Sequence, residues 1–180
     1  MARSGVRTNV VRILDAMEVD LRNASSITAA VSGTDNVLPL TLTIPQRYSE
    51  YEPAASLAGD PGRSATRLLP TFDPQTAKLQ FPEPITVTFS LVAAGATAKD
   101  VTRAVTWTAP RGAKHTASRV IATIPADTKI TFGKPAGGLL TANDLSIVAK
   151  VSAQSNSKAG RTSAPIAAAS TIFLRTKSLK

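Results

Sequence analysis

The second half of the chain alternates between apolar and polar residues over several short stretches, and this alternation constrains the fold more than any other feature. Residues 85–91 place an apolar side chain at every second position, with threonine or serine between them. The same period of two returns at 120–124, 130–132 and 145–151, and a last strand is expected near 170–175. Successive side chains of a strand point to opposite faces of a sheet, so each stretch predicts a half-buried strand.

The first half adds two strand candidates. Residues 26–32 form a short one that ends at a turn signal, 33–36. Residues 38–44 alternate strictly, and Pro39 predicts an edge position, or a place near the start of the strand, because proline cannot donate to a ladder. Short strands separated by turns are typical of antiparallel folds. The sequence therefore predicts a single mainly-β domain over residues 1–180, an antiparallel β-sandwich or a jelly-roll-like barrel.

The alternation also assigns the faces of two neighbouring strands. Val101, Val105 and Trp107 share a face with Arg103, so we expect the early part of that strand to be partly wet. In the next strand the apolar face is expected to consist of Val120, Ala122 and Ile124.

The N-terminal segment, 1–25, is ambiguous. Five apolar residues between Val10 and Leu21 fall within a narrow arc at 100° per residue, which indicates an amphipathic helix over 10–22 with Asn9 as its N-cap. A different set of apolar residues in the same stretch follows a strand's period of two. The helix is favoured, and the strand stays open as an alternative.

The alternation of apolar and polar residues stops at 45–84. Seven of the chain's twelve prolines fall there and no apolar period persists. A connection this long is unusual in a compact domain unless it is functional or bound to a partner. A disordered insertion is the alternative. The apolar content favours an ordered excursion that packs on its own domain or on a neighbouring subunit. We expect its aromatic and leucine residues to form a subunit interface: Tyr48, Tyr51, Leu68, Leu69 and Phe72.

No residue pattern indicates catalysis, a cofactor or a small-molecule substrate. The chain has no cysteine and one histidine, so it offers no ligand set for a transition metal. His115 is expected in a solvated loop. Asp15 and Glu18 are expected as exposed neighbours on a helix, and nothing suggests the burial that would separate the pKa values of paired carboxylates. The sequence predicts a protein that is not an enzyme.

The charge is strongly asymmetric. Residues 1–90 contain eight Lys/Arg and nine Asp/Glu, a net charge of −1, whereas residues 91–180 contain thirteen and three, a net charge of +10. A basic half of this kind suggests a polyanionic partner, although basic residues can also serve only to solvate a surface. No apolar run is long enough for a signal peptide or a membrane span, so no membrane partner is expected.

The basic residues cluster outside the expected strands, in one hairpin connection, one polar segment and the tail at 176–180. Lysine and arginine on loops and termini suit sequence-independent neutralisation of phosphates. We therefore predict non-specific nucleic-acid binding by Arg111, Lys114, Arg119, Lys158, Arg161, Arg175, Lys177 and Lys180.

In general layout, a small cysteine-free β-rich chain with basic polar termini and a long proline-rich excursion resembles the small coat proteins of simple viruses and bacteriophages. The resemblance implies a self-assembling capsid subunit, located in the virion, that packages nucleic acid electrostatically. One departure is that the N-terminal arm holds only Arg3, Arg7 and Arg12 rather than a dense basic run. The alternative is an immunoglobulin-like adhesion or phage-tail module without nucleic-acid contact, and a cytoplasmic location is the alternative to the virion.

Overall fold

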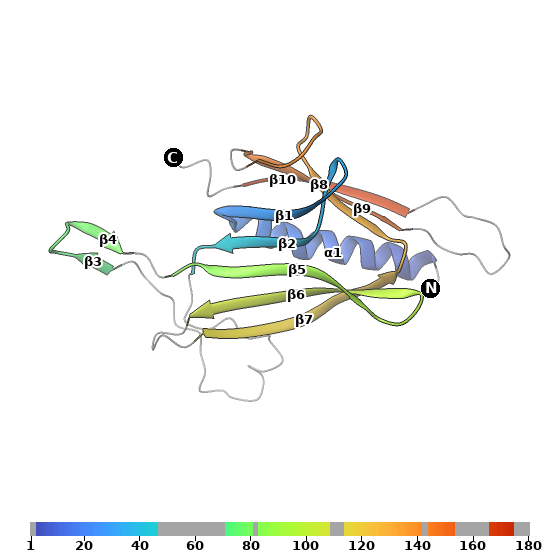
Figure 1. The fold of residues 1–180 in the computed structure, drawn as a ribbon, viewed down its shortest axis with the longest axis horizontal. Coiled ribbons are helices and arrows are strands. Elements are labelled where there is room, and N and C mark those ends of the chain that lie inside the picture. The colour runs from blue at the N-terminus through green and yellow to red at the C-terminus, as the bar shows by residue number, and fades with distance from the viewer. Residues whose placement is uncertain are drawn as a thin grey trace.

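A computed structural model describes residues 3–46, 71–80, 83–108, 114–141, 144–153 and 166–174 (Figure 1). Within these residues, eight of the ten strands form one antiparallel sheet and the other two form a separate hairpin. The prediction of a mainly-β antiparallel fold with an N-terminal helix is confirmed. The elements are α1 (Arg3–Asn23), β1 (Ser26–Ser32), β2 (Asp35–Ile44), β3 (Thr71–Asp73), β4 (Lys78–Gln80), β5 (Ile85–Ala93), β6 (Ala98–Thr108), β7 (Lys114–Pro125), β8 (Lys129–Gly133), β9 (Ser146–Ala153) and β10 (Ile166–Phe173).

Helix α1 forms because most of its apolar residues recur at spacings of three and four and face the sheet, whereas Val11 and Val19 are exposed. The helix already begins at Arg3, so the prediction of Asn9 as its N-cap is wrong. Asn9 lies inside the helix, and its Nδ2 donates a hydrogen bond to the carbonyl oxygen of Thr123 on β7 at 2.7 Å. The fully buried side of the helix consists of Val6, Val10, Ile13, Met17 and Leu21.

The sheet has the strand order β10-β9-β8-β2-β5-β6-β7, with β1 also paired to β2. Strand β2 joins the two halves of the sheet, β10-β9-β8 on one side and β5-β6-β7 on the other. Its first residues pair with β8 at Asn36 and Val37, and the stretch from Leu40 to Ile44 pairs with β5.

Pro39 marks neither an edge nor the start of a strand, because β2 lies in the middle of the sheet and already begins at Asp35. The pairing with β1 runs from Ala30 opposite Val37 to Ala29 opposite Leu40, so Leu38 and Pro39 form a bulge with a cis peptide bond between them. A proline is tolerated in a central strand at such a bulge, because the unpaired residue has no ladder hydrogen bond to lose.

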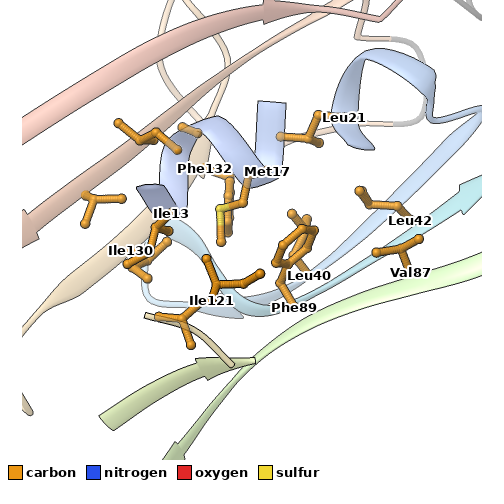
Figure 2. Close-up of a cluster of buried hydrophobic side chains, with 14 of the residues drawn as sticks. Ile13, Met17, Leu21, Leu40, Leu42, Val87, Phe89, Ile121, Ile130 and Phe132 are labelled. Carbon is orange, nitrogen blue, oxygen red and sulfur yellow. The ribbon is translucent and has the colours of Figure 1, made fainter. Parts of the chain in front are cut away.

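Both ends of the sheet reach the same helix. Helix α1 contacts β7 and β10, the two terminal strands of the order, and also β9 and β2. The sheet therefore curves around α1, and the helix fills the inner face of an open, barrel-like arrangement. In Figure 2, side chains of α1 such as Ile13 and Met17 point toward strand residues such as Phe89 and Phe132, and all four belong to one buried cluster.

A β-bulge in β7 changes which side chains reach this core. Val101 pairs with Ala122, but the next residue, Thr102, pairs with Val120, so Ile121 is an extra residue in β7. Ile121 is consequently buried, while Val120 is 54% exposed. The prediction that Val120 shares the buried face of Ala122 is wrong, because a period of two does not survive an inserted residue.

The excursion at 45–84 contains a hairpin that the sequence did not predict. Strands β3 and β4 pair through Phe72 opposite Leu79, and the carboxylate of Asp73 accepts hydrogen bonds from Gln75 N and Thr76 Oγ1 in the turn. Figure 1 shows the hairpin standing away from the main sheet. Phe72 is 63% exposed. The other predicted interface residues lie outside the described residues: Tyr48, Tyr51, Leu68 and Leu69.

Candidate nucleic-acid interface

Only two of the eight basic residues predicted to bind nucleic acid lie in the described part of the chain. Lys114 and Arg119 are both exposed on β7. Lys114 pairs with Thr108, and Arg119 pairs with Arg103, whose side chain points toward α1. The two residues are therefore on opposite faces of the sheet and do not form one patch. Outside the described residues lie Arg111, Lys158, Arg161, Arg175, Lys177 and Lys180.

Two of the basic residues in the N-terminal arm lie on the exposed side of α1. Arg7 and Arg12 line a shallow hollow of about 440 Å³ together with Thr8, Val11 and Asp15. Because α1 covers the inner face of the sheet, this hollow cannot join with a site on the outer face.

The outer face of β1, β2, β5, β6 and β7 is covered with hydroxyl groups. The strand registers align them into rows across the sheet, and neighbouring hydroxyls bond to one another, as Ser90 does with Thr102 at 2.8 Å and Thr106 with Thr116 at 2.9 Å. We call this surface the hydroxyl face. One row is Ser26, Thr43, Thr86, Thr106 and Thr116, and the next is Thr28, Thr41, Thr88, Ala104 and Ser118.

These two rows contain no charged residue. Threonine has a high strand propensity, which by itself accounts for many of these residues. Chemically, rows of hydroxyls can donate hydrogen bonds to phosphate and sugar oxygens, but they cannot neutralise phosphate charge. Charge for that purpose has to come from elsewhere on the same face.

Two lysines supply it on the outer face of β8 and β9. Lys129 pairs with Ser152 and Thr131 pairs with Lys150, so the two lysines are diagonal neighbours on one face. They line a hollow of about 440 Å³, which we call the lysine hollow. Its other lining residues are Asp35, Thr131, Val151, Ser152, Ala167, Ala168 and Ala169.

The lysine hollow is open and shallow, and its chemistry suits an extended anion rather than an enclosed ligand. Lys129, Lys150 and Asp35 are all exposed, and no ion pair joins Asp35 to either lysine in the described residues. Small side chains from β10 form one wall, so an elongated backbone could approach closely. The outer face is continuous from here to the hydroxyl face, because Val37 of β2 pairs with Thr131.

A third lysine is held beside this hollow. Lys134 lines a smaller cavity of about 120 Å³ with Gly137 and Gly138, and its Nζ lies 3.7 Å from Asp144 Oδ1. Desolvation raises the pKa of Asp144, but hydrogen bonds from the backbone N and Oγ1 of Thr141 and the charge of Lys134 outweigh it. The pKa of Asp144 is therefore lowered from its usual value.

Sequence reasoning missed Lys129 and Lys150 because it looked for basic residues in loops. The signal was present, since both occupy the polar positions of an alternating stretch, opposite the buried Ile130 and Val151. Assigning strand faces first, and then asking which charges share the outer face, would have identified the pair.

Of the residues considered for catalysis, His115 and Glu18 make contacts within the fold. His115 lies in β7 rather than in a loop, and its ring stacks on Trp107 with centroids 5.6 Å apart. Asp15 is exposed, but Glu18 is not simply a solvated neighbour, because it accepts a hydrogen bond from Ser170 Oγ at 3.1 Å and forms an ion pair with Arg22. Among the described residues, no group of three potential ligands could hold a metal ion.

Within the same residues, no helix combines the length and the apolar character that crossing a membrane requires. Comparison with known proteins gives no relative: no family model, no curated protein and no solved structure matches the chain.

Proposed function

We propose that the protein is a self-assembling structural subunit, a coat subunit of a virus or bacteriophage, whose outer sheet face contacts nucleic acid without reading its sequence. In this proposal the lysine hollow neutralises phosphates and the adjoining hydroxyl face bonds to the backbone. The virion is the corresponding location.

The observation that carries the proposal is the placement of Lys129 and Lys150 beside a continuous hydroxyl surface. Contacts to phosphate and sugar from lysine, serine and threonine are the ones that position a protein on nucleic acid without specifying sequence. Base recognition needs exposed aromatic platforms or a reading element. On the sheet, Trp107, Phe89 and Phe132 are buried and cannot stack on bases, while Phe173 at the end of β10 is exposed and offers a single platform.

The surplus charge of the second half supports the same proposal. Many copies of a chain with a net charge of +9 repel one another unless a polyanion compensates them. A shell around nucleic acid supplies this compensation. Binding then depends on many weak contacts made together, rather than on one strong site.

One observation favours a second candidate, an adhesion or phage-tail module without nucleic-acid contact. The two hydroxyl rows are uncharged, and a neutral flat surface also suits docking to another protein. The two candidates differ in salt dependence, because only phosphate contacts release counterions.

The test is the affinity for a single-stranded RNA and for a DNA duplex of mixed sequence, measured across a series of salt concentrations. For the variant K129Q/K150Q we expect the slope of log affinity against log salt to fall by roughly 1.4–1.8, since each neutralised phosphate contributes about 0.7–0.9. The matched control is K78Q/K99Q, which removes the same charge from the hairpin and from β6. Equal slopes for the two variants, or binding that does not respond to salt, would contradict the proposal.

A further inference from the structure

Three strands in the described part of the sheet pair with only one neighbour: β1, β7 and β10. An edge strand presents unpaired backbone N–H and C=O groups, which another chain can pair with. Proteins usually protect such edges with charges, prolines, bulges or short strand length. The three edges here differ in how far they are protected.

Strand β7 carries these protections: it has a bulge at Ile121, charged residues at Lys114 and Arg119, and Pro125 at its end. Strand β1 has seven residues without charge or proline, but its pairing with β2 is interrupted between Ala29 and Ala30 by the bulge of β2.

Strand β10 has none of them. Its eight residues, Ile166–Phe173, include no charge, proline or glycine, and their register with β9 is unbroken. Its last residue, Phe173, is 70% exposed, more than any other large apolar side chain in the described residues. After Ile166, the side chains in the first half of the strand are small (Ala167, Ala168, Ala169) and those in the second half are larger (Thr171, Ile172, Phe173).

We propose that β10 pairs antiparallel with β10 of a second copy across a two-fold axis at Ser170. In this register the three large residues of the second half each meet an alanine of the other copy: Phe173 meets Ala167, Ile172 meets Ala168, and Thr171 meets Ala169, while Ile166 meets Leu174 just beyond the strand. Residues directly opposite in an antiparallel pair point to the same face, and each of these pairs satisfies that requirement. A two-fold contact needs one patch that is complementary to itself, and this distribution of small and large residues provides it.

The charges do not oppose a second copy at this edge. The nearest lysine on the outer face, Lys150, lies on β9 opposite Ala169. The two Lys150 residues would stand three strand spacings apart, about 14 Å. That distance exceeds the Debye length of about 8 Å at physiological salt, so their repulsion is largely screened.

The contact also completes the candidate site. Ala167, Ala168 and Ala169 form the β10 wall of the lysine hollow. Pairing at β10 would place two such hollows side by side on one outer face, giving a groove with four lysines, two from each copy. This consequence for nucleic-acid binding rests on the proposed function, whereas the strand contact itself does not.

The contact can be tested by cross-linking, because the full-length chain has no native cysteine. The Cα atoms of an opposed antiparallel pair are about 4.5–5.5 Å apart, within the range that a disulfide spans. We expect S170C to give a covalent dimer on a non-reducing gel after mild oxidation. The matched control, S118C on the protected edge β7, should stay monomeric.

A second variant tests the contact without cysteine. A169K places a charge on the edge and should raise the dimer dissociation constant at least 100-fold, whereas S118K should leave it unchanged. Circular dichroism establishes that both variants are folded; if A169K does not fold, S170C decides. No S170C dimer, or equal cross-linking by S118C, would overturn the proposal. A cross-linked dimer that binds no nucleic acid would support the contact and contradict the coat function, and particles on nucleic acid in which S170C chains do not cross-link would do the reverse.

Discussion

Asp20 of α1 and Arg103 of β6 form a two-point ion pair, with Nε of Arg103 donating to Oδ2 at 2.6 Å and Nη2 donating to Oδ1 at 2.9 Å. The side chain of Asp20 is only 9% exposed and that of Arg103 20%. The early part of this strand was expected to be partly wet, and Arg103 does remain partly exposed, but it is paired rather than simply solvated. The arginine on its inner face is held by a carboxylate of the helix.

Removing one partner of this pair should destabilise the fold more than removing both. R103A leaves the carboxylate of Asp20 buried without its partner, and we expect a loss of about 3 kcal/mol in the free energy of unfolding, at the lower end of the range for buried pairs. The double variant D20L/R103M should lose less than about 1 kcal/mol, since both charges are gone. Urea unfolding followed by circular dichroism measures both values.

Arg119 provides the control for that prediction, because it lies opposite Arg103 on β7 and is exposed. R119A should change stability by no more than about 0.5 kcal/mol. A loss for R103A as small as that for R119A would show that the ion pair does not fasten the helix to the sheet.

The helix should be indispensable to the core. Met17 is fully buried, while Val19 on the same helix is 63% exposed. M17A should lower the free energy of unfolding by about 2–5 kcal/mol through the cavity that it leaves, and V19A by no more than about 0.5 kcal/mol. Similar midpoints for the two variants in urea would mean that α1 does not fill the inner face of the sheet.

The single tryptophan, Trp107, reports on the end of β6 and the start of β7. Trp107 is buried, and the exposed ring of His115 stacks over it. H115A should admit water and shift the fluorescence maximum of Trp107 to longer wavelength, with a small loss of stability. The control K114A changes the neighbouring residue on the opposite face and should leave the spectrum as it is; an identical shift in both variants would contradict the stacking.

The stability of the fold should depend on pH through Asp144, which lies at the turn beside the lysine hollow. Since its pKa is lowered in the folded state, the carboxylate stabilises the fold above its usual pKa of about 3.9, and this contribution disappears as the pH falls through the folded value. Thermal unfolding should give D144N a lower Tm than the natural protein at pH 6–7, and the difference should shrink as the pH falls below about 3.9. A Tm difference that persists unchanged at pH 2 would show that the ionised carboxylate is not responsible.

Local periodicity was enough to predict most of the fold. The alternation at 85–91 and 145–151 predicted β5 and β9, although Leu145 precedes β9 and is 57% exposed, and the spacing of apolar residues in α1 favoured a helix. Two features could not be predicted, because they depend on partners far along the chain. The extra residue Ile121 can be recognised only from the pairing of β7 with β6. The bulge at Leu38 and Pro39 lies where the pairing of β2 changes from β8 to β5.

The candidate site was harder to predict than the fold. Lys129 and Lys150 are 21 positions apart in the sequence and become neighbours only through the β8–β9 register. The small wall of their hollow comes from a third strand, β10. The basic residues that cluster along the sequence were expected in loops. Residues that are close in sequence in a loop need not lie on one face of the sheet.

The most direct test of the coat proposal is light scattering coupled to size-exclusion chromatography of the full-length protein, with absorbance recorded at 260 and 280 nm. The proposal predicts a particle of many copies whose absorbance ratio indicates nucleic acid, and which releases that nucleic acid at high salt. A monomer or a simple dimer with the absorbance ratio of protein alone, unchanged between low and high salt, would contradict it.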